Sequence, residues 1–120
     1  MKKRVDAVYL HHMLDAAREI DSFLAGVSEA LFYQNRMLQS AVAHQLQVIG
    51  EAARQVSREF QAEHPEVPWS DIIGTRHRIV HDYLNVDLAV VWSVTQEDLP
   101  ALRGQLATIL SSLESDPDAS

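Results

Sequence analysis

The 120-residue chain contains no cysteine. This absence excludes disulfides, thiolate zinc sites and thiol nucleophiles. Glycine and proline are also scarce, with four of each, so little in the chain interrupts regular structure. No apolar run approaches the roughly 20 residues that cross a bilayer, and nothing resembles a signal peptide. We therefore expect a cytoplasmic protein.

Positive charge is in short supply. Ten Lys and Arg residues stand against 17 Asp and Glu residues, which gives a net charge of −7. Nonspecific affinity for nucleic acid comes mainly from neutralising phosphates, and an acidic chain opposes it. If this protein handles RNA, it needs a local basic site or an assembly that concentrates positive charge. A hydrophobic content of 47% argues against disorder, and the length indicates one domain.

Helical periodicity is present almost throughout the chain. Apolar residues recur every three to four positions, and no stretch alternates with period two for long enough to predict a strand. The pattern predicts an all-α antiparallel bundle over residues 1–114, followed by a flexible tail at 115–120. Four main helices are expected, with room for a short fifth helix around Ser28 to Tyr33. Their expected ranges are residues 5–25, 36–60, 69–85 and 88–114.

Several residues mark the expected helix boundaries. Gly26 is a plausible stop for the first helix, and Asn35 and Asp87 are suited to cap the helices that follow them. Pro65 and Pro68 separate the second helix from the third, because proline lacks the N–H that helix continuation requires. Pro100 falls inside the last apolar pattern, where we expect a kink or a restart.

Arg76 is the unusual residue of the third predicted helix. When residues 69–84 are treated as one helix, Arg76 falls near the middle of an apolar arc formed by Trp69, Ile72, Ile73, Ile79, Val80 and Leu84. A guanidinium is always charged and has five donors to satisfy, so this position is costly unless an anion or partner binds there. Arg76 is thus a candidate functional residue. The equally weighted alternative is neutralisation within the fold, by Glu51 of the second helix.

His81 supplies the chemistry that Arg76 lacks. A histidine can take the proton from a ribose 2′-hydroxyl, while a guanidinium holds the nonbridging oxygens of the phosphate. Five positions separate the two residues, about 140° around an ideal helix, so one helix does not place both on the same face. A symmetric dimer that pairs two copies of this helix would bring them into one cleft. Such a cleft suits RNA cleavage without a metal.

Two neighbouring residues have simpler interpretations as well. His77 and His81 have a spacing that supports metal binding in some helices, but two ligands are not a site, so we expect no metal. Glu51 follows Gly50, and a glycine inside a helix usually marks a close helix contact. Glu51 is then either near that contact and the site, or a surface carboxylate.

The spacing Arg76-x4-His81-x-Tyr83 resembles the motif of HepT-like toxins, a branch of the HEPN superfamily. The resemblance extends over nearly the whole chain. Segments that are similar to the family are Val48-Ile49-Gly50-Glu51-Ala52-Ala53, the turn from His64 to Trp69 with Ile72-Ile73-Gly74, and the stretch from Val86 to Pro100. An ordered set of segments is far more specific than Arg-x4-His alone.

The resemblance implies a homodimeric endoribonuclease toxin of a type VII-like toxin-antitoxin system. Arg76 and His81 would form a catalytic pair between protomers, with no metal or cofactor. The partner would be a nucleotidyltransferase antitoxin of the MntA type, which transfers AMP from ATP to Tyr83. Helical spacing puts Tyr83 on the same face as Arg76, where added phosphates would occupy the guanidinium and repel RNA. The supporting residues are Glu51, His77, Arg78 and Asp82.

The expected partners are a second copy of the chain, the antitoxin and an RNA substrate, either tRNA or mRNA, with no DNA or membrane partner. Two other functions fit the same residues. One is a noncatalytic module that binds a nucleotide or substrate beside a nucleotidyltransferase and uses Arg76 to do so. The other is a purely structural dimerisation bundle. His77 stands where an asparagine is common in HepT-like proteins, which allows an additional base at the site.

Overall fold

The computed structural model describes residues 2–82 and 85–115. The chain is built of helices, with a short two-stranded ladder near residue 80. The elements in order are α1 (Lys2–Leu24), α2 (Glu29–Gln34), α3 (Arg36–Gln55), α4 (Arg58–Glu63), α5 (Trp69–Ile73), α6 (Thr75–Ile79), β1 (Val80–Asp82), β2 (Asn85–Val86), α7 (Leu88–Ser93), the π-helix η1 (Val94–Asp98) and α8 (Leu99–Ser115). The predicted all-α class is confirmed.

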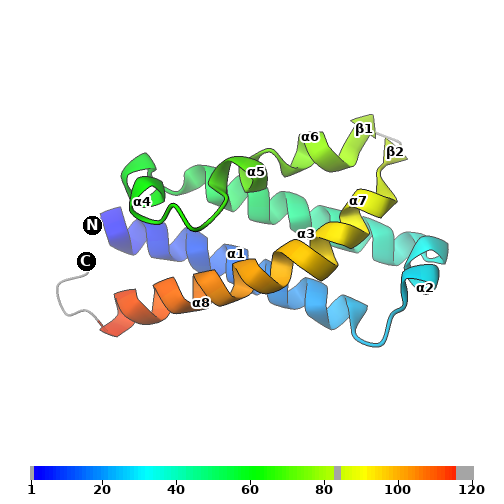
Figure 1. Cartoon of the computed structure of the whole chain (residues 1–120), viewed down its shortest axis with the longest axis horizontal. Helices are drawn as coiled ribbons and strands as arrows, with labels where there is room; N and C mark the ends of the chain where they lie inside the picture. Colours follow the sequence, from blue (N-terminus) through cyan, green and yellow to red (C-terminus); the bar gives the residue numbers. More distant parts are fainter. Residues whose placement is uncertain (1, 83–84, 116–120) are drawn as a thin grey trace.

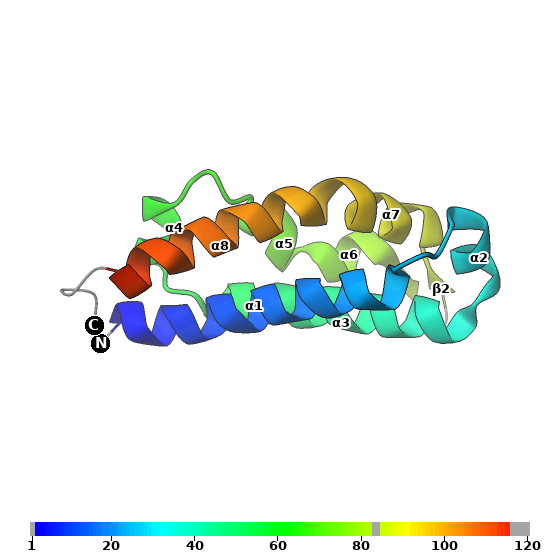
Figure 2. The same ribbon diagram turned by 90° about the horizontal axis from the view of Figure 1, so that it is seen from below.

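Two layers make up the elongated molecule, which measures 49 × 29 × 20 Å. Helices α1 and α3 pack against each other along their lengths, and α8 packs against α1. Figure 2 shows α1 and α3 in one layer, with the column formed by α7, η1 and α8 above them. Helices α5 and α6 pack on α3 and run along one long edge of the molecule (Figure 1). That edge carries the segment singled out by the sequence.

Two of the predicted helix starts are confirmed by side-chain caps, and one predicted helix end is confirmed by its backbone conformation. The Asn35 side chain accepts a hydrogen bond from the Leu38 N–H at 3.0 Å and begins α3. Asp87 accepts one from the Val90 N–H at 3.1 Å and begins α7. Each cap satisfies a backbone donor that has no partner within its helix. Gly26 has a φ of +73°, a left-handed conformation that ends α1 and that other residues rarely adopt.

Pro100 has the predicted effect on the last helix. The chain runs from α7 through one π-helical turn, Val94–Asp98, into α8, which begins at Leu99. Because proline cannot donate to the carbonyl four residues earlier, the hydrogen-bond ladder has to be rearranged in this turn. The inward-facing residues beyond it are buried as expected, namely Leu99, Leu102, Leu106 and Ile109. Helix α8 ends at Ser115, and the tail predicted for 115–120 otherwise lies outside the described residues.

The second helix is shorter than the predicted range of 36–60. It ends at Gln55, and Ser57 caps a separate short helix, α4, with its Oγ accepting from the Phe60 N–H at 3.2 Å. The break is stabilised by the buried Asp6 of α1, whose carboxylate accepts from the Ser57 N–H and Oγ–H, both at 2.8 Å. A contact between residues 51 positions apart is not visible in the local apolar pattern. The predicted helix therefore extended too far, to residue 60.

The third predicted helix is also interrupted. Helix α5 ends at Ile73, Gly74 lies between α5 and α6 with φ −82° and ψ 7°, and α6 ends at Ile79. From Val80 the chain is extended, and β1 pairs antiparallel with β2 through Val80–Val86 and Asp82–Asn85. The prediction that no strand would form was therefore wrong here. The β-branched pair Ile79-Val80 and the glycine both weaken helix formation, and tertiary packing decides the outcome.

The position of Arg76 differs from the sequence prediction. Thr75 and Ile79 are the buried residues of α6, whereas Arg76, His77 and Arg78 are exposed. Thr75 tolerates burial because its hydroxyl donates to the Ile72 carbonyl at 2.7 Å. The side of α6 that faces the core is therefore not the apolar arc predicted for an ideal helix over residues 69–84, in which Arg76 was central. Arg76 therefore places no charge in the hydrophobic core.

Gly50 marks a close helix contact, as predicted. A Cβ atom added at Gly50 would lie 2.9 Å from the Ile72 carbonyl oxygen. The absence of a side chain thus lets α5 approach α3 closely, and α6 follows directly from α5. Gly50 consequently sets how near the Arg76 segment lies to α3.

We expect Gly50→Ala to lower the free energy of unfolding. The clash with a backbone carbonyl costs about 1–3 kcal/mol, which outweighs the ~1 kcal/mol that alanine gains over glycine in helix propensity. The matched control is Gly104→Ala in α8, where an added Cβ meets nothing within 4 Å. That variant should be stabilised by about 0.5–1 kcal/mol. Urea denaturation of both variants measures the difference, and equal stabilisation of the two would contradict the close contact.

Within the described part of the chain, no helix is both long and apolar enough to pass through a membrane.

Candidate functional site

Arg76 borders a small cleft between α3 and the α5–α6 segment. The cleft has a volume of about 80 Å³ and is lined by Gln47, Gly50, Glu51, Arg54, Ile73 and Arg76. Helix α3 supplies one wall, and the close contact at Gly50 sets the width. Arg76 comes from the first turn of α6, next to the buried Thr75, so its backbone position is held by the core.

The charges of the cleft are two guanidinium groups and one carboxylate. Arg54 and Glu51 form an ion pair with a distance of 3.7 Å between Nε and Oε2, and both side chains are largely exposed. In the part of the chain that the structure describes, Arg76 forms no ion pair with Glu51 or with any other carboxylate. The alternative in which Glu51 neutralises Arg76 within the fold is thus not observed. Arg76 keeps its donors available for an anion.

His81 lies close to Arg76 along the chain but in a different element. It belongs to strand β1, and the backbone N–H of Val80 closes α6 by bonding to the Arg76 carbonyl. The angle of about 140° expected between Arg76 and His81 therefore does not apply, because it assumed an unbroken helix. The alignment expected between Arg76 and Tyr83 rested on the same assumption of an unbroken helix, which ends at Ile79. The side chains of His81 and Asp82, and all of Tyr83, lie outside the described residues.

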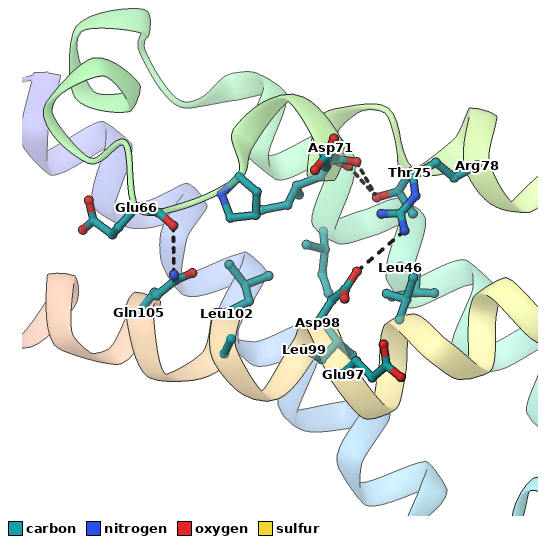
Figure 3. A pocket seen from close by; sticks show the side chains of 15 residues that line it. Leu46, Glu66, Asp71, Thr75, Arg78, Glu97, Asp98, Leu99, Leu102 and Gln105 are labelled. Carbon is teal, nitrogen blue, oxygen red and sulfur yellow. Dashed lines mark hydrogen bonds and ion pairs between the residues drawn. The ribbon is translucent and has the colours of Figure 1, made fainter.

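Of the supporting residues, His77 and Arg78 are both exposed on α6, and Arg78 faces away from the Arg76 cleft. Figure 3 shows Arg78 reaching Asp98 of η1, with a distance of 3.7 Å between Nη2 and Oδ2. One short helix therefore presents Arg76 toward α3 and Arg78 toward η1. The two arginines serve different surfaces.

The groove beside Arg78 is larger than the Arg76 cleft, at about 350 Å³. Its apolar floor includes Leu46, Leu99 and Leu102 (Figure 3). Four carboxylates also line it, against the single arginine, from Glu66, Asp71, Glu97 and Asp98. This excess of negative charge repels phosphate, so the larger cavity is poorly suited to RNA. The smaller cleft has the appropriate charge.

Sequence analysis missed two residues of the cleft, Gln47 and Arg54. Together with Glu51 they are spaced four and three positions apart, so they share one face of α3 beside Gly50. That spacing was visible in the sequence, but nothing in it indicated that α6 would cover this face. Among the described residues, no three His, Asp or Glu side chains gather in a way that would hold a metal ion.

The fold and the cleft define a mostly helical protein with an exposed cationic site on an otherwise acidic molecule. The Ribonuclease HepT-like family matches residues 13–109, and the chain belongs to this family. The match covers α3, the cleft and the whole Arg76–Tyr83 segment.

Individual relatives agree with this membership. The chain is 33% identical to "Probable ribonuclease HepT" of Thermococcus cleftensis over 86% of its own length and 94% of that protein. It is 29% identical to "Putative RNase MJ1380" of Methanocaldococcus jannaschii over 91% of its length and 100% of that protein. It is 31% identical to "Putative RNase TTE0752" of Caldanaerobacter subterraneus subsp. tengcongensis over 85% and 91% respectively. No solved structure matches the chain significantly.

Proposed function

We propose that this protein is a metal-independent endoribonuclease and the toxin of a type VII-like toxin-antitoxin pair. The observation that carries the proposal is Arg76, an exposed guanidinium with no ion pair within the described residues, in a cleft whose width is set by Gly50. Membership of the Ribonuclease HepT-like family and the names of the relatives support the same activity. RNA is the substrate class, with tRNA and mRNA both open.

In the proposed reaction, the His81 imidazole removes the proton of a ribose 2′-hydroxyl. The 2′-oxygen then forms a bond to the adjacent phosphorus, and the bond from phosphorus to the 5′-oxygen breaks. Arg76 donates two hydrogen bonds to the nonbridging oxygens, where negative charge increases in the transition state. The leaving 5′-oxygen takes a proton from water, and the His81 imidazolium gives its proton to the resulting hydroxide, which restores the base. The products are a 2′,3′-cyclic phosphate and a free 5′-hydroxyl.

We further propose that the active site is completed by a second copy of the chain. Arg76 is on the exposed side of α6, at the long edge of the molecule (Figure 1), and β1 with His81 follows directly. Pairing of two such edges about a twofold axis would place the Arg76 of one protomer opposite the His81 region of the other. Burial of Arg76 between protomers would also exclude water and strengthen its hold on phosphate.

The test is incubation of the purified protein with mixed tRNA and mRNA in excess EDTA, followed by analysis of the product ends. Cleavage that leaves 2′,3′-cyclic phosphates supports the proposal. A protein that binds RNA or nucleotide but leaves RNA intact in this assay, and that does not arrest growth when expressed, is a binding module instead.

For regulation, we propose that a cognate nucleotidyltransferase of the MntA type transfers AMP from ATP to the Tyr83 hydroxyl, with release of pyrophosphate and of the hydroxyl proton. Each AMP unit would add a negatively charged phosphodiester to the segment that follows Arg76 and His81 in the chain, and we propose that this charge competes with RNA for Arg76. We expect incubation with that enzyme and ATP to raise the mass of the chain by one adenylyl group for each AMP unit transferred. RNA cleavage should be lost in parallel, and intact-mass spectrometry with peptide mapping measures both site and extent.

The matched control is Tyr33→Phe, which removes an exposed tyrosine hydroxyl from α2, whereas Tyr83→Phe removes the proposed acceptor. Only the Tyr83 variant should resist modification. The Tyr33 hydroxyl donates to Glu29 at 2.9 Å, and this hydrogen bond raises the pKa of Tyr33, so its hydroxyl ionises less readily than that of an ordinary tyrosine. Neutralisation of the toxin with Tyr83 left unmodified would indicate inhibition by complex formation alone.

A further inference from the structure

Arg76 is not the only cation of its cleft. Arg54, from the last turn of α3, lines the same cleft, and its side chain is 60% exposed. Gln47 and Glu51 precede it on the same face of α3. Two arginines from two different elements thus line one small opening. On a chain with a net charge of −7, this is a local concentration of positive charge.

The ion pair of Arg54 with Glu51 is weak enough for another anion to replace the Glu51 carboxylate. The two side chains are 60% and 68% exposed, and the 3.7 Å separation is too long for a hydrogen bond. Exposed pairs of this kind contribute little to stability. A phosphodiester offers two oxygens to the guanidinium fork in a bidentate geometry, which is a stronger interaction than the one Arg54 makes here.

We infer that Arg54 is a second phosphate-binding residue, which holds the RNA backbone at the cleft beside Arg76, and that Glu51 competes with RNA for Arg54. The inference rests on the proposed ribonuclease function, because it assigns RNA as the anion. It gives Glu51 an inhibitory part: its carboxylate occupies Arg54 in the free protein and repels the incoming phosphate. Loss of Arg54 and loss of Glu51 should therefore change RNA affinity in opposite directions.

The experiment measures binding of a fluorescein-labelled single-stranded RNA by anisotropy, on protein that also carries His81→Ala so that the RNA stays intact. Arg54→Gln should weaken binding on the order of tenfold, as expected for one lost charged contact. It should also reduce the slope of log K against log salt by about 0.7, the value for one phosphate contact on a single strand. The control Arg58→Gln removes the same charge from α4, outside the cleft, and should stay within about twofold.

Glu51→Gln should tighten binding several-fold, because it frees Arg54 and removes a negative charge from the cleft. Its control is Glu63→Gln, which makes the same change of net charge at an exposed position of α4. If Glu51→Gln and Glu63→Gln change the RNA affinity by the same factor, Glu51 does not compete with RNA. If Arg54→Gln and Arg58→Gln act alike, Arg54 does not bind the backbone. Either result overturns the inference.

Failure of the inference can be separated from failure of the proposed function. In protein with His81 intact, Arg54→Gln should raise KM about tenfold and leave kcat nearly unchanged, since Arg54 binds substrate without acting on the reacting bonds. If the wild-type protein cleaves RNA and Arg54→Gln leaves KM unaltered, the role of Arg54 in RNA binding is rejected, while the ribonuclease function stands. If the wild-type protein does not cleave RNA but binds it in a way that depends on Arg54, the ribonuclease function is rejected, while the role of Arg54 in RNA binding stands.

Discussion

His81→Ala protein is expected to leave RNA intact under conditions in which the wild-type protein cleaves it. Removal of a general base typically lowers the rate by a factor of about 10²–10⁴. The measurement is the single-turnover cleavage rate of a labelled RNA in EDTA. The variant should also have lost the ability to arrest growth when it is expressed alone.

The control for this prediction is His44→Ala, which removes an exposed imidazole from α3 at a position outside the cleft. It should cleave RNA within about twofold of the wild-type rate, because surface substitutions away from a site change little. Circular dichroism and urea denaturation show whether each variant is folded. A folded His81→Ala protein with the wild-type rate would reject the catalytic assignment.

Substitution of Arg76 is expected to produce the second large effect. Arg76→Gln removes the donors that we propose stabilise charge on the phosphorane, so kcat should fall by about 10²–10³. Arg76→Lys keeps the positive charge but loses the fork geometry, and it should have an intermediate rate. The order wild type, lysine, glutamine in kcat is the specific result that a phosphate-binding guanidinium requires.

The same variants test the position of Arg76 in the fold. Because Arg76 is exposed and has no ion pair among the described residues, Arg76→Gln should change the free energy of unfolding by no more than about 0.5 kcal/mol. A large stabilisation would instead mean that the Arg76 charge is buried at a cost in stability, as expected for an unbroken helix. That result would favour a purely structural role for the protein. Urea denaturation of Arg76→Gln beside wild type decides between them.

A mixture of the two inactive proteins examines whether the site is shared between protomers. If each site takes Arg76 from one chain and His81 from the other, a heterodimer of Arg76→Gln and His81→Ala chains contains one intact site. After subunit exchange at equal concentrations, about a quarter of the wild-type activity should return, from the statistics of a twofold dimer. No recovery, in a mixture shown to exchange, would place both groups in one chain.

How much of this molecule could be predicted from sequence depends on the range of the interactions involved. Asn35 and Asp87 were identified correctly as caps, because a capping side chain bonds a backbone N–H three residues away. Pro100 was identified correctly as a disturbance, since proline alters its own turn. The all-α class follows from apolar periodicity, which is also a local property. The family resemblance, carried by Arg76, His81 and their flanking segments, was visible for the same reason.

The errors concern long-range contacts. Helix α3 ends where the buried Asp6 binds Ser57, and the Trp69 segment is divided at Gly74 and leaves the helix at Val80. The buried face of α6 depends on how α5 docks on α3 at Gly50, and a small rotation of a helix is sufficient to move a side chain between core and solvent. Arg76 was placed in the apolar stripe because an ideal unbroken helix was assumed.

The sequence by itself determined the helical class, the side-chain caps of α3 and α7 and the identity of the residues that could perform chemistry, because each depends on residues near one another in the chain. Tertiary structure decided which of those residues meet. Arg54 and Arg76 are 22 positions apart and line one cleft because a glycine lets α5 contact α3 closely. Arg78, two residues from Arg76, belongs to a different and acidic groove. Packing between helices, which no local pattern encodes, brings the first pair together and separates the second.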